Sequence, residues 1–134
     1  MTVAALDLDF FESFKGSDSL LFHGNQAAVR KLAELLEQLT QQEEASLDLH
    51  EVPEVNPHEI ELTVIRSEEE GGLERQGQRF AWRNNSKTWE SFALAVRNLA
   101  ESSQGHVYLE GSSQTYPVVV SCNEYSAIFN RTDA

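Results

Sequence analysis

Two stretches of equal length decide the fold of this chain. Residues 20–50 read LLFHGNQAAVRKLAELLEQLTQQEEASLDLH, and residues 80–110 read FAWRNNSKTWESFALAVRNLAESSQGHVYLE. Aligned without a gap, few pairs are identical, but the apolar positions coincide almost throughout: Phe22 lies against Trp82 and Leu36 against Val96. Such a period is typical of two copies of one supersecondary unit that bury their apolar faces together. We therefore predict an internal repeat, and we expect function to lie where the two copies differ.

The first copy is predicted to contain one helix among strands. Asn25 follows a glycine and can accept a hydrogen bond at the helix N-terminus, and Val29, Leu32 and Leu36 recur at helical spacing. Alternation of polar and apolar residues, with turn residues between the runs, predicts the strands. They are expected over residues 3–10, 19–23, 46–50 and 59–66.

The second copy repeats this order. Leu73–Arg83 is read as one alternating strand, with Arg75, Arg79 and Arg83 on one face, where they are expected to pair with acidic side chains of the chain. A helix capped by Asn85 or Ser86 follows. Two closing strands are predicted over residues 106–110 and 116–121, and a short terminal helix over 123–129.

Each copy therefore reads strand, helix, strand, strand, and has too little core to stand alone. We predict a single α+β domain over residues 1–134, with one repeat over about 3–66 and the other over about 73–121. The two tandem repeats are expected to share one antiparallel sheet, with both helices packed on one face.

Composition restricts the class of protein. The chain has 134 residues and one cysteine, Cys122, which excludes an intramolecular disulfide framework and a four-cysteine zinc site. There is no apolar run long enough to span a membrane, and the N-terminus lacks the basic region of a secretory signal, so a cytoplasmic location is expected.

The net charge of −12 is unevenly distributed. Residues 1–70 hold 16 acidic and 4 basic side chains, which gives −12, whereas residues 71–134 hold 6 of each. Such a field repels nucleic acid and attracts basic partners. Solubility alone is an alternative explanation of the same excess.

Motifs for catalysis, metal binding or phosphate binding are weak. The sequence has no nucleophile elbow and no glycine-rich phosphate loop. His50 and His58 are spaced like no established zinc motif, and Cys122 would need a neighbour such as His106 to act as a nucleophile. We predict no catalytic residue, no cofactor and no metal site.

A polar sheet face is the best candidate for binding. If Val107 and Leu109 face the core, His106, Tyr108 and Glu110 face the other way, and the matching residues of the first copy, Ser46, Asp48 and His50, are also polar. Such a face, if not simply solvated, is a natural docking surface. The candidate partner-binding residues are Asp48, His50, Glu51, Glu54, Glu68, Glu69, Glu70, His106, Tyr108 and Glu110.

Three segments resemble a family of small immunity proteins from bacterial polymorphic-toxin systems. They are the turn Leu21–Asn25, the helix Val29–Leu36 and the strand Ile60–Arg66, within residues 20–66. The family's His-x-His-Leu-Asp strand reads Ser-Leu-Asp-Leu-His at residues 46–50 and His-Val-Tyr-Leu-Glu at residues 106–110, so the second copy keeps the first histidine and an acid. The resemblance implies inhibition of a toxin by binding, without catalysis, and an acidic surface would suit a basic toxin active site.

The leading hypothesis is thus a non-enzymatic, cytoplasmic inhibitor of a basic partner. A homodimer is compatible with this hypothesis. One alternative is a small enzyme or ligand-binding domain with a cleft around His106, Tyr108 and Cys122. Another is a structural, self-associating module.

Overall fold

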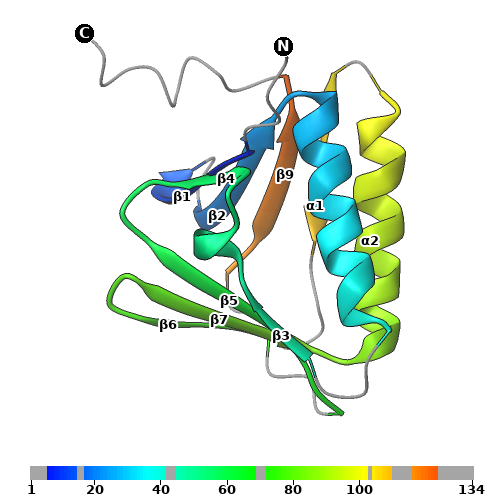
Figure 1. Cartoon of the computed structure of the whole chain (residues 1–134). Coiled ribbons are helices and arrows are strands. Elements are labelled where there is room, and N and C mark those ends of the chain that lie inside the picture. The colour runs from blue at the N-terminus through cyan, green and yellow to red at the C-terminus, as the bar shows by residue number, and fades with distance from the viewer. Residues whose placement is uncertain are drawn as a thin grey trace, which may run out of the picture.

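A computed structural model of the chain describes residues 6–14, 17–41, 45–68, 72–102, 104–109 and 116–123. Within these ranges it has nine strands, two α-helices and one 3-10 turn (Figure 1). In chain order they are β1 (Leu6–Phe14), β2 (Ser17–Gly24), α1 (Gln26–Leu39), β3 (Ala45–Asp48), η1 (Leu49–Glu51), β4 (Val55–Pro57), β5 (Glu61–Arg66), β6 (Gly72–Gln76), β7 (Arg79–Asn84), α2 (Ser86–Ala100), β8 (Gly105–Leu109) and β9 (Val118–Cys122).

The strands form two sheets, so the α+β class is confirmed. The first sheet has the order β4-β1-β2-β9-β8 and the second has the order β3-β5-β7-β6. Both are mixed, because β2 pairs in parallel with β9, β5 with β7, and β1 with β4. The expectation of one shared antiparallel sheet is therefore wrong.

The two halves of the chain exchange strands between the sheets. The hairpin β1–β2 of the first half pairs through β2 with β9 of the second half, and the hairpin β6–β7 of the second half pairs through β7 with β5 of the first. The strands β8 and β3 lie beyond β9 and β5. The registers correspond: Phe22 lies opposite Val120, and Trp82, its counterpart sixty residues on, lies opposite Val64. Because each sheet contains strands of both halves, the two halves do not lie side by side in a single sheet. An origin of the halves by repetition of one unit stays a prediction.

Counterparts of the alignment also meet in space. Glu37 of α1 and Arg97 of α2 are sixty residues apart, and the Arg97 guanidinium donates to both Glu37 carboxylate oxygens at 2.7 and 2.8 Å. At the other end of the molecule, Arg75 lies 4.5 Å from the ring centroid of Phe10. Phe10 pairs with Leu20, and Arg75 pairs with Phe80, the residue aligned with Leu20. Phe10 and Arg75 therefore occupy corresponding positions in their hairpins. Residues at corresponding positions of the two halves are thus in contact at two places in the molecule.

Each helix begins at an asparagine whose side chain caps its first turn. The Asn25 side chain accepts from Ala28 N at 2.9 Å, and Asn85 accepts from Thr88 N at 2.8 Å, so both predicted caps are confirmed. The helices lie side by side and antiparallel against the sheets (Figure 1), and Gln26 at the start of α1 donates to Ala100 O at the end of α2.

One core joins both sheets and both helices. Among the buried residues are the α1 stripe and the aromatic residues of the second half; Trp82 lies 5.0 Å from Trp89 and 5.4 Å from Phe92, measured between ring centroids. Trp89 also donates from its indole nitrogen to Ile65 O at 2.9 Å. These rings therefore belong to the buried core of the protein.

Some local predictions need correction or lie outside the description. The segment 73–83 is a hairpin with a turn at Gly77 and Gln78, where Gly77 has φ of 65°, rather than one strand. The strand predicted to end at His50 ends at Asp48 and continues as η1. The predicted terminal helix lies outside the described residues, apart from Asn123. Neither helix of the described chain has the length and apolarity that a bilayer crossing requires.

Candidate functional site

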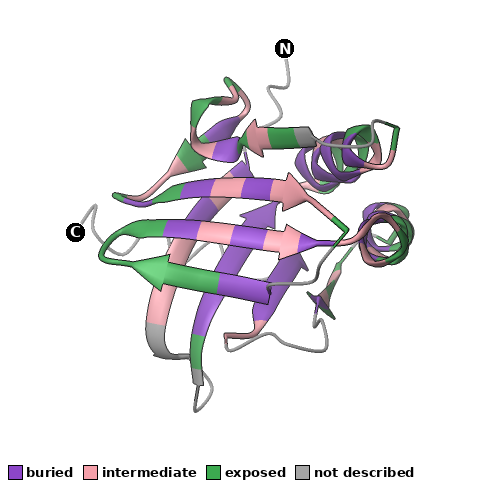
Figure 2. Cartoon of the chain, turned by 90° about the horizontal axis from the view of Figure 1, so that it is seen from below, coloured by how far each residue is buried: buried purple, intermediate pink, exposed green. Residues whose placement is uncertain are grey.

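The outer face of the second sheet is the open surface nearest to the candidate residues. Seen from below in Figure 2, its strands lie in front and the helices lie to one side. The register places Asp48, Thr63, Ala81 and Glu74 in one row across β3, β5, β7 and β6. Because Ala81 is small, the row is hollow at its centre.

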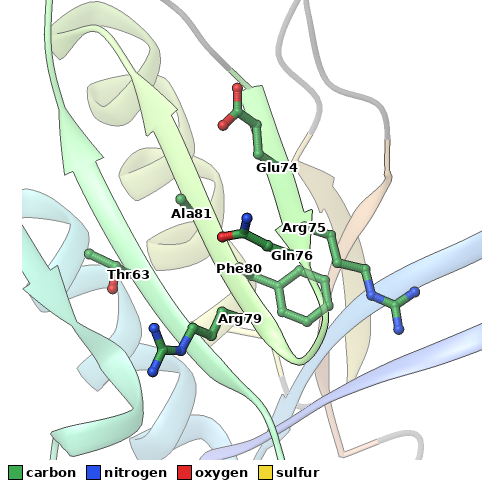
Figure 3. Close-up of a pocket in the computed structure, with 7 residues that line it drawn as sticks. All are labelled: Thr63, Glu74, Arg75, Gln76, Arg79, Phe80 and Ala81. Carbon is green, nitrogen blue, oxygen red and sulfur yellow. The ribbon is translucent and has the colours of Figure 1, made fainter.

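A depression of about 430 Å³ occupies this hollow and runs around the β6–β7 hairpin (Figure 3). It is lined by Thr63, Glu74, Arg75, Gln76, Arg79, Phe80 and Ala81. Figure 3 shows the side chains of Glu74, Arg75 and Arg79 pointing in three different directions. The lining combines an aromatic ring and a methyl group with polar side chains and charges of both signs, which suits a peptide or a protein surface.

The three arginines of the hairpin do not form the stripe that the sequence predicts. Arg79 lies on the outer face, 78% exposed, with its Nε atom 3.6 Å from Glu61 Oε1. Arg75 lies opposite Phe80 and packs over the ring of Phe10, while its Nε donates to Gly77 O at 2.9 Å. The two-residue turn shifts the alternation by one position, so Arg75 and Arg79 face opposite sides.

Four exposed acids follow one border of the open face: Asp48, Glu51, Glu59 and Glu61, which we call the acidic edge. His50 lies among them, half-buried, with Nε2 at 3.8 Å from Glu51 Oε2 and 3.9 Å from Glu61 Oε1. Asp48 is held by Thr63, whose hydroxyl donates to the carboxylate at 2.7 Å. The acidic edge thus combines several carboxylates with few nearby cations.

His50 is placed by the end of β3. The last pair between β3 and β5 is Asp48 with Thr63, so the preceding residue of β5, Leu62, has no partner on β3. The Leu62 N–H donates instead to His50 Nδ1 at 3.0 Å. When Nδ1 accepts this hydrogen bond, the proton of the neutral imidazole is on Nε2, the nitrogen that faces the two glutamates.

The same geometry bears on metal binding. Ligand atoms of Asp48, His50 and Glu51 lie within 4.8 Å of one another. His50 Nδ1 lies 3.0 Å from Leu62 N and 3.3 Å from Leu62 O, so the main chain of β5 can partner either tautomer of the ring. The group thus consists of two exposed carboxylates beside a histidine that is anchored to β5.

The remaining candidate residues are dispersed. Glu54 lies 3.7 Å from Lys31 Nζ, and Glu68 is exposed just after β5. Glu69, Glu70 and Glu110 lie outside the described residues. His106 and Tyr108 are exposed on β8, with ring centroids 5.6 Å apart.

The predicted common polar face does not exist in this arrangement. Ser46 and Asp48 are exposed as predicted, and so are His106 and Tyr108, but β3 borders the second sheet and β8 borders the first. The strand exchange between the halves separates them. A docking surface built from both strands is therefore wrong.

The described residues around Cys122 also do not bring Cys122 and His106 together. Cys122 is fully buried in the core, with its Sγ 3.8 Å from Ser102 O, and it pairs with Gly105 in the sheet. His106 pairs with Ser121 and is exposed on the opposite face of the first sheet. The thiol and the imidazole therefore point away from each other.

A polar row that sequence reasoning missed crosses the outer face of the first sheet. The register aligns Asn56, Asp7, His23 and Ser121 on β4, β1, β2 and β9. Asp7 is held by His58 Nε2 and Asn56 Nδ2, each at 3.0 Å, whereas His23 and Ser121 are buried. Burial of that pair leaves no access for a substrate, and strands so distant in sequence give no motif by which the row could be found.

Comparisons of the chain with protein-family models, curated proteins and solved structures find no match.

Proposed function

We propose that this chain is a non-enzymatic protein-binding module, an inhibitor of the immunity type that covers a basic toxin domain. The observation that carries the proposal is the acidic edge beside an open, hollow sheet face. Basic active sites are attracted to such a surface over distances comparable to the Debye length, and the attraction raises the association rate more than the final affinity.

The distribution of ion pairs supports the choice of this surface. Among the acids of the first half, Glu37 is bound to Arg97 and Glu54 lies near Lys31. On the acidic edge, by contrast, only Glu61 has a basic side chain of Lys or Arg within 4 Å among the described residues, and that side chain, Arg79, is highly exposed. Part of the uncompensated negative charge of the first half therefore lies beside the depression. As part of the proposal, the inhibitor acts in the cytoplasm of a bacterium.

The proposal is tested by charge reversal at the acidic edge. The bait variants are Glu51→Lys/Glu61→Lys and, as the matched control, Glu90→Lys/Glu101→Lys, which makes the same change in net charge on the exposed side of α2 and its C-terminus. Proteins captured from a bacterial lysate are compared at low salt and at about 0.5 M salt, where surface charges are screened.

We expect a basic protein to be retained by the wild type and the control, to be lost from the acidic-edge variant, and to lose its activity when the purified chain is added. Equal capture by all three baits would refute the role of the acidic edge. A captured protein whose activity is unchanged would refute inhibition, and capture of only the chain itself would favour the homo-oligomeric alternative.

A further inference from the structure

The strand β6 is an edge of the second sheet whose main-chain groups are available. It pairs with β7 only, and Gln76 and Arg79 flank the two-residue turn as partners. In such a hairpin the hydrogen-bonded pairs alternate, so Glu74 bonds to Ala81, and the peptide groups of Leu73 and Arg75 point away from β7. Within the described part of the chain, no hydrogen bond outside the hairpin reaches these peptide groups.

The equivalent edge of the first sheet is covered. Leu8 pairs with Phe22 as Leu73 pairs with Trp82, and the outward groups of β1 are bonded to the segment around β4. Leu6 N donates to Glu54 O at 2.8 Å, and Leu8 O accepts from His58 N at 2.9 Å. The molecule thus shows on β1 how an extended segment adds in parallel to an edge of this type.

We infer that the β6 edge receives an extended, basic segment of a protein partner, which adds to the second sheet as β4 adds to the first. The inference rests on the proposed function and identifies the surface that the partner's backbone uses. Addition of a strand to an exposed edge is an established mode of peptide recognition, in which main-chain hydrogen bonds supply affinity and side chains supply specificity.

The side chains of β6 determine the chemistry of the segment. Gly72, Glu74 and Gln76 share the outer face, and their only charge is the exposed carboxylate of Glu74. Directly opposite side chains of neighbouring strands lie close enough to interact, so a lysine or arginine opposite Glu74 is favoured. Figure 3 shows the side chains of Arg75 and Arg79 directed away from Glu74. Arg79 Nε lies 3.6 Å from Glu61 Oε1, and the Arg75 guanidinium lies 4.5 Å from the ring centroid of Phe10.

A second copy of the chain is a poorer occupant. Pairing of two β6 edges would bring together two molecules that each carry a net charge of −12. An edge that carries charges is also a common means of preventing such self-pairing.

The test uses the intact protein and an eight-residue peptide of alternating lysine and valine. Amide hydrogen exchange at Leu73 and Arg75 is followed by NMR. The control peptides are one of the same charge with two central valines replaced by proline, and one of alternating glutamate and valine. We expect the lysine peptide to slow exchange at both amides by about tenfold or more, and the controls to leave it unchanged.

Two variants of one residue separate the backbone from the side chain. Arg75→Ala and Arg75→Pro both remove the guanidinium, but only proline removes the outward N–H. Thermal unfolding establishes that both variants are folded. Binding retained by Arg75→Ala and abolished by Arg75→Pro is the expected result, and equal loss in both would overturn the inference.

Other outcomes also overturn it. Slow exchange at Leu73 and Arg75 without peptide would mean that the edge is already covered, by a second copy if the protection depends on concentration and by the chain itself if it does not. Exchange that no peptide alters would also count against the inference. Because the peptide assay is independent of the lysate experiment, a failure at the β6 edge is distinguishable from a failure of the acidic edge.

Discussion

Replacement of His50 by alanine should destabilise the fold by about 2 kcal/mol. Its ring nitrogen accepts the hydrogen bond from Leu62 N at 3.0 Å, and Leu62 is fully buried. Leaving a buried N–H without an acceptor costs about 1–3 kcal/mol. The imidazole is only 18% exposed, so its loss also removes packing beneath η1.

The matched variant is His50→Asn. A side-chain amide oxygen can take the place of Nδ1, so we expect asparagine to restore more than half of the lost stability, although its side chain is smaller. The free energy of unfolding is measured in urea with both variants and the wild type. For a domain of this size, the alanine variant should lower Tm by roughly 6–10 °C.

Two results would refute this account of His50. If alanine and asparagine destabilised equally, the ring would matter through packing and not as an acceptor. If alanine cost less than about 0.5 kcal/mol, the Leu62 N–H would find water instead, and η1 would not be fixed to β5 by this hydrogen bond.

Two further predictions concern the helices. Asn25→Ala and Asn85→Ala should each lower the free energy of unfolding by about 1 kcal/mol because each removes one capping acceptor. The control, Asn98→Ala, changes an exposed residue inside α2 and should be neutral or slightly stabilising. Similar losses of stability at all three asparagines would contradict the capping argument. The hydrogen bond from Arg97 lowers the pKa of Glu37 below its usual 4.5, with a smaller opposing effect of burial and a further lowering by the Arg97 charge. Between the lowered pKa of the folded state and the ordinary pKa of 4.5, the unfolded state therefore binds more protons than the folded state. The stabilisation by Glu37 is complete above about pH 4.5 and is lost as the pH falls through the pKa of the folded state. Glu37→Gln should accordingly be less stable than the wild type at about pH 7 but not at about pH 3; a difference that persists unchanged at the lower pH would exclude the ion pair as its cause.

The local elements could be predicted because their signals are local. A helix repeats every 3.6 residues, and a side chain such as that of Asn25 caps it three residues away, so α1 and its buried stripe follow from a short window of sequence. The exposure of Asp48 and Tyr108 follows from alternation within single strands.

The pairing of strands could not be predicted in the same way. The apolar residues Phe22 and Val120 would alternate identically in a parallel or an antiparallel sheet, and with either half as partner. An alternation read straight through the turn at Gly77 and Gln78 hides the β6–β7 hairpin and assigns Arg75 to the wrong face, because the turn shifts the alternation by one position. The candidate surface was consequently assembled from residues of two different sheets.

The two halves differ in the segments that follow β3 and β8. In the second half, Leu109 continues β8 and pairs with Val118, but its counterpart, Leu49, leaves the sheet and starts η1. The chain that departs there supplies His50 as a substitute partner for Leu62, contributes acids to the open face, and ends by adding β4 to β1. One segment thus covers an edge of the first sheet and places carboxylates at the border of the second. The β6 edge has no such added strand among the described residues, and in the order β3-β5-β7-β6 it lies across the sheet from β3; under the two proposals, a partner that contacts both the acidic edge and the β6 edge would therefore span the open face of the second sheet.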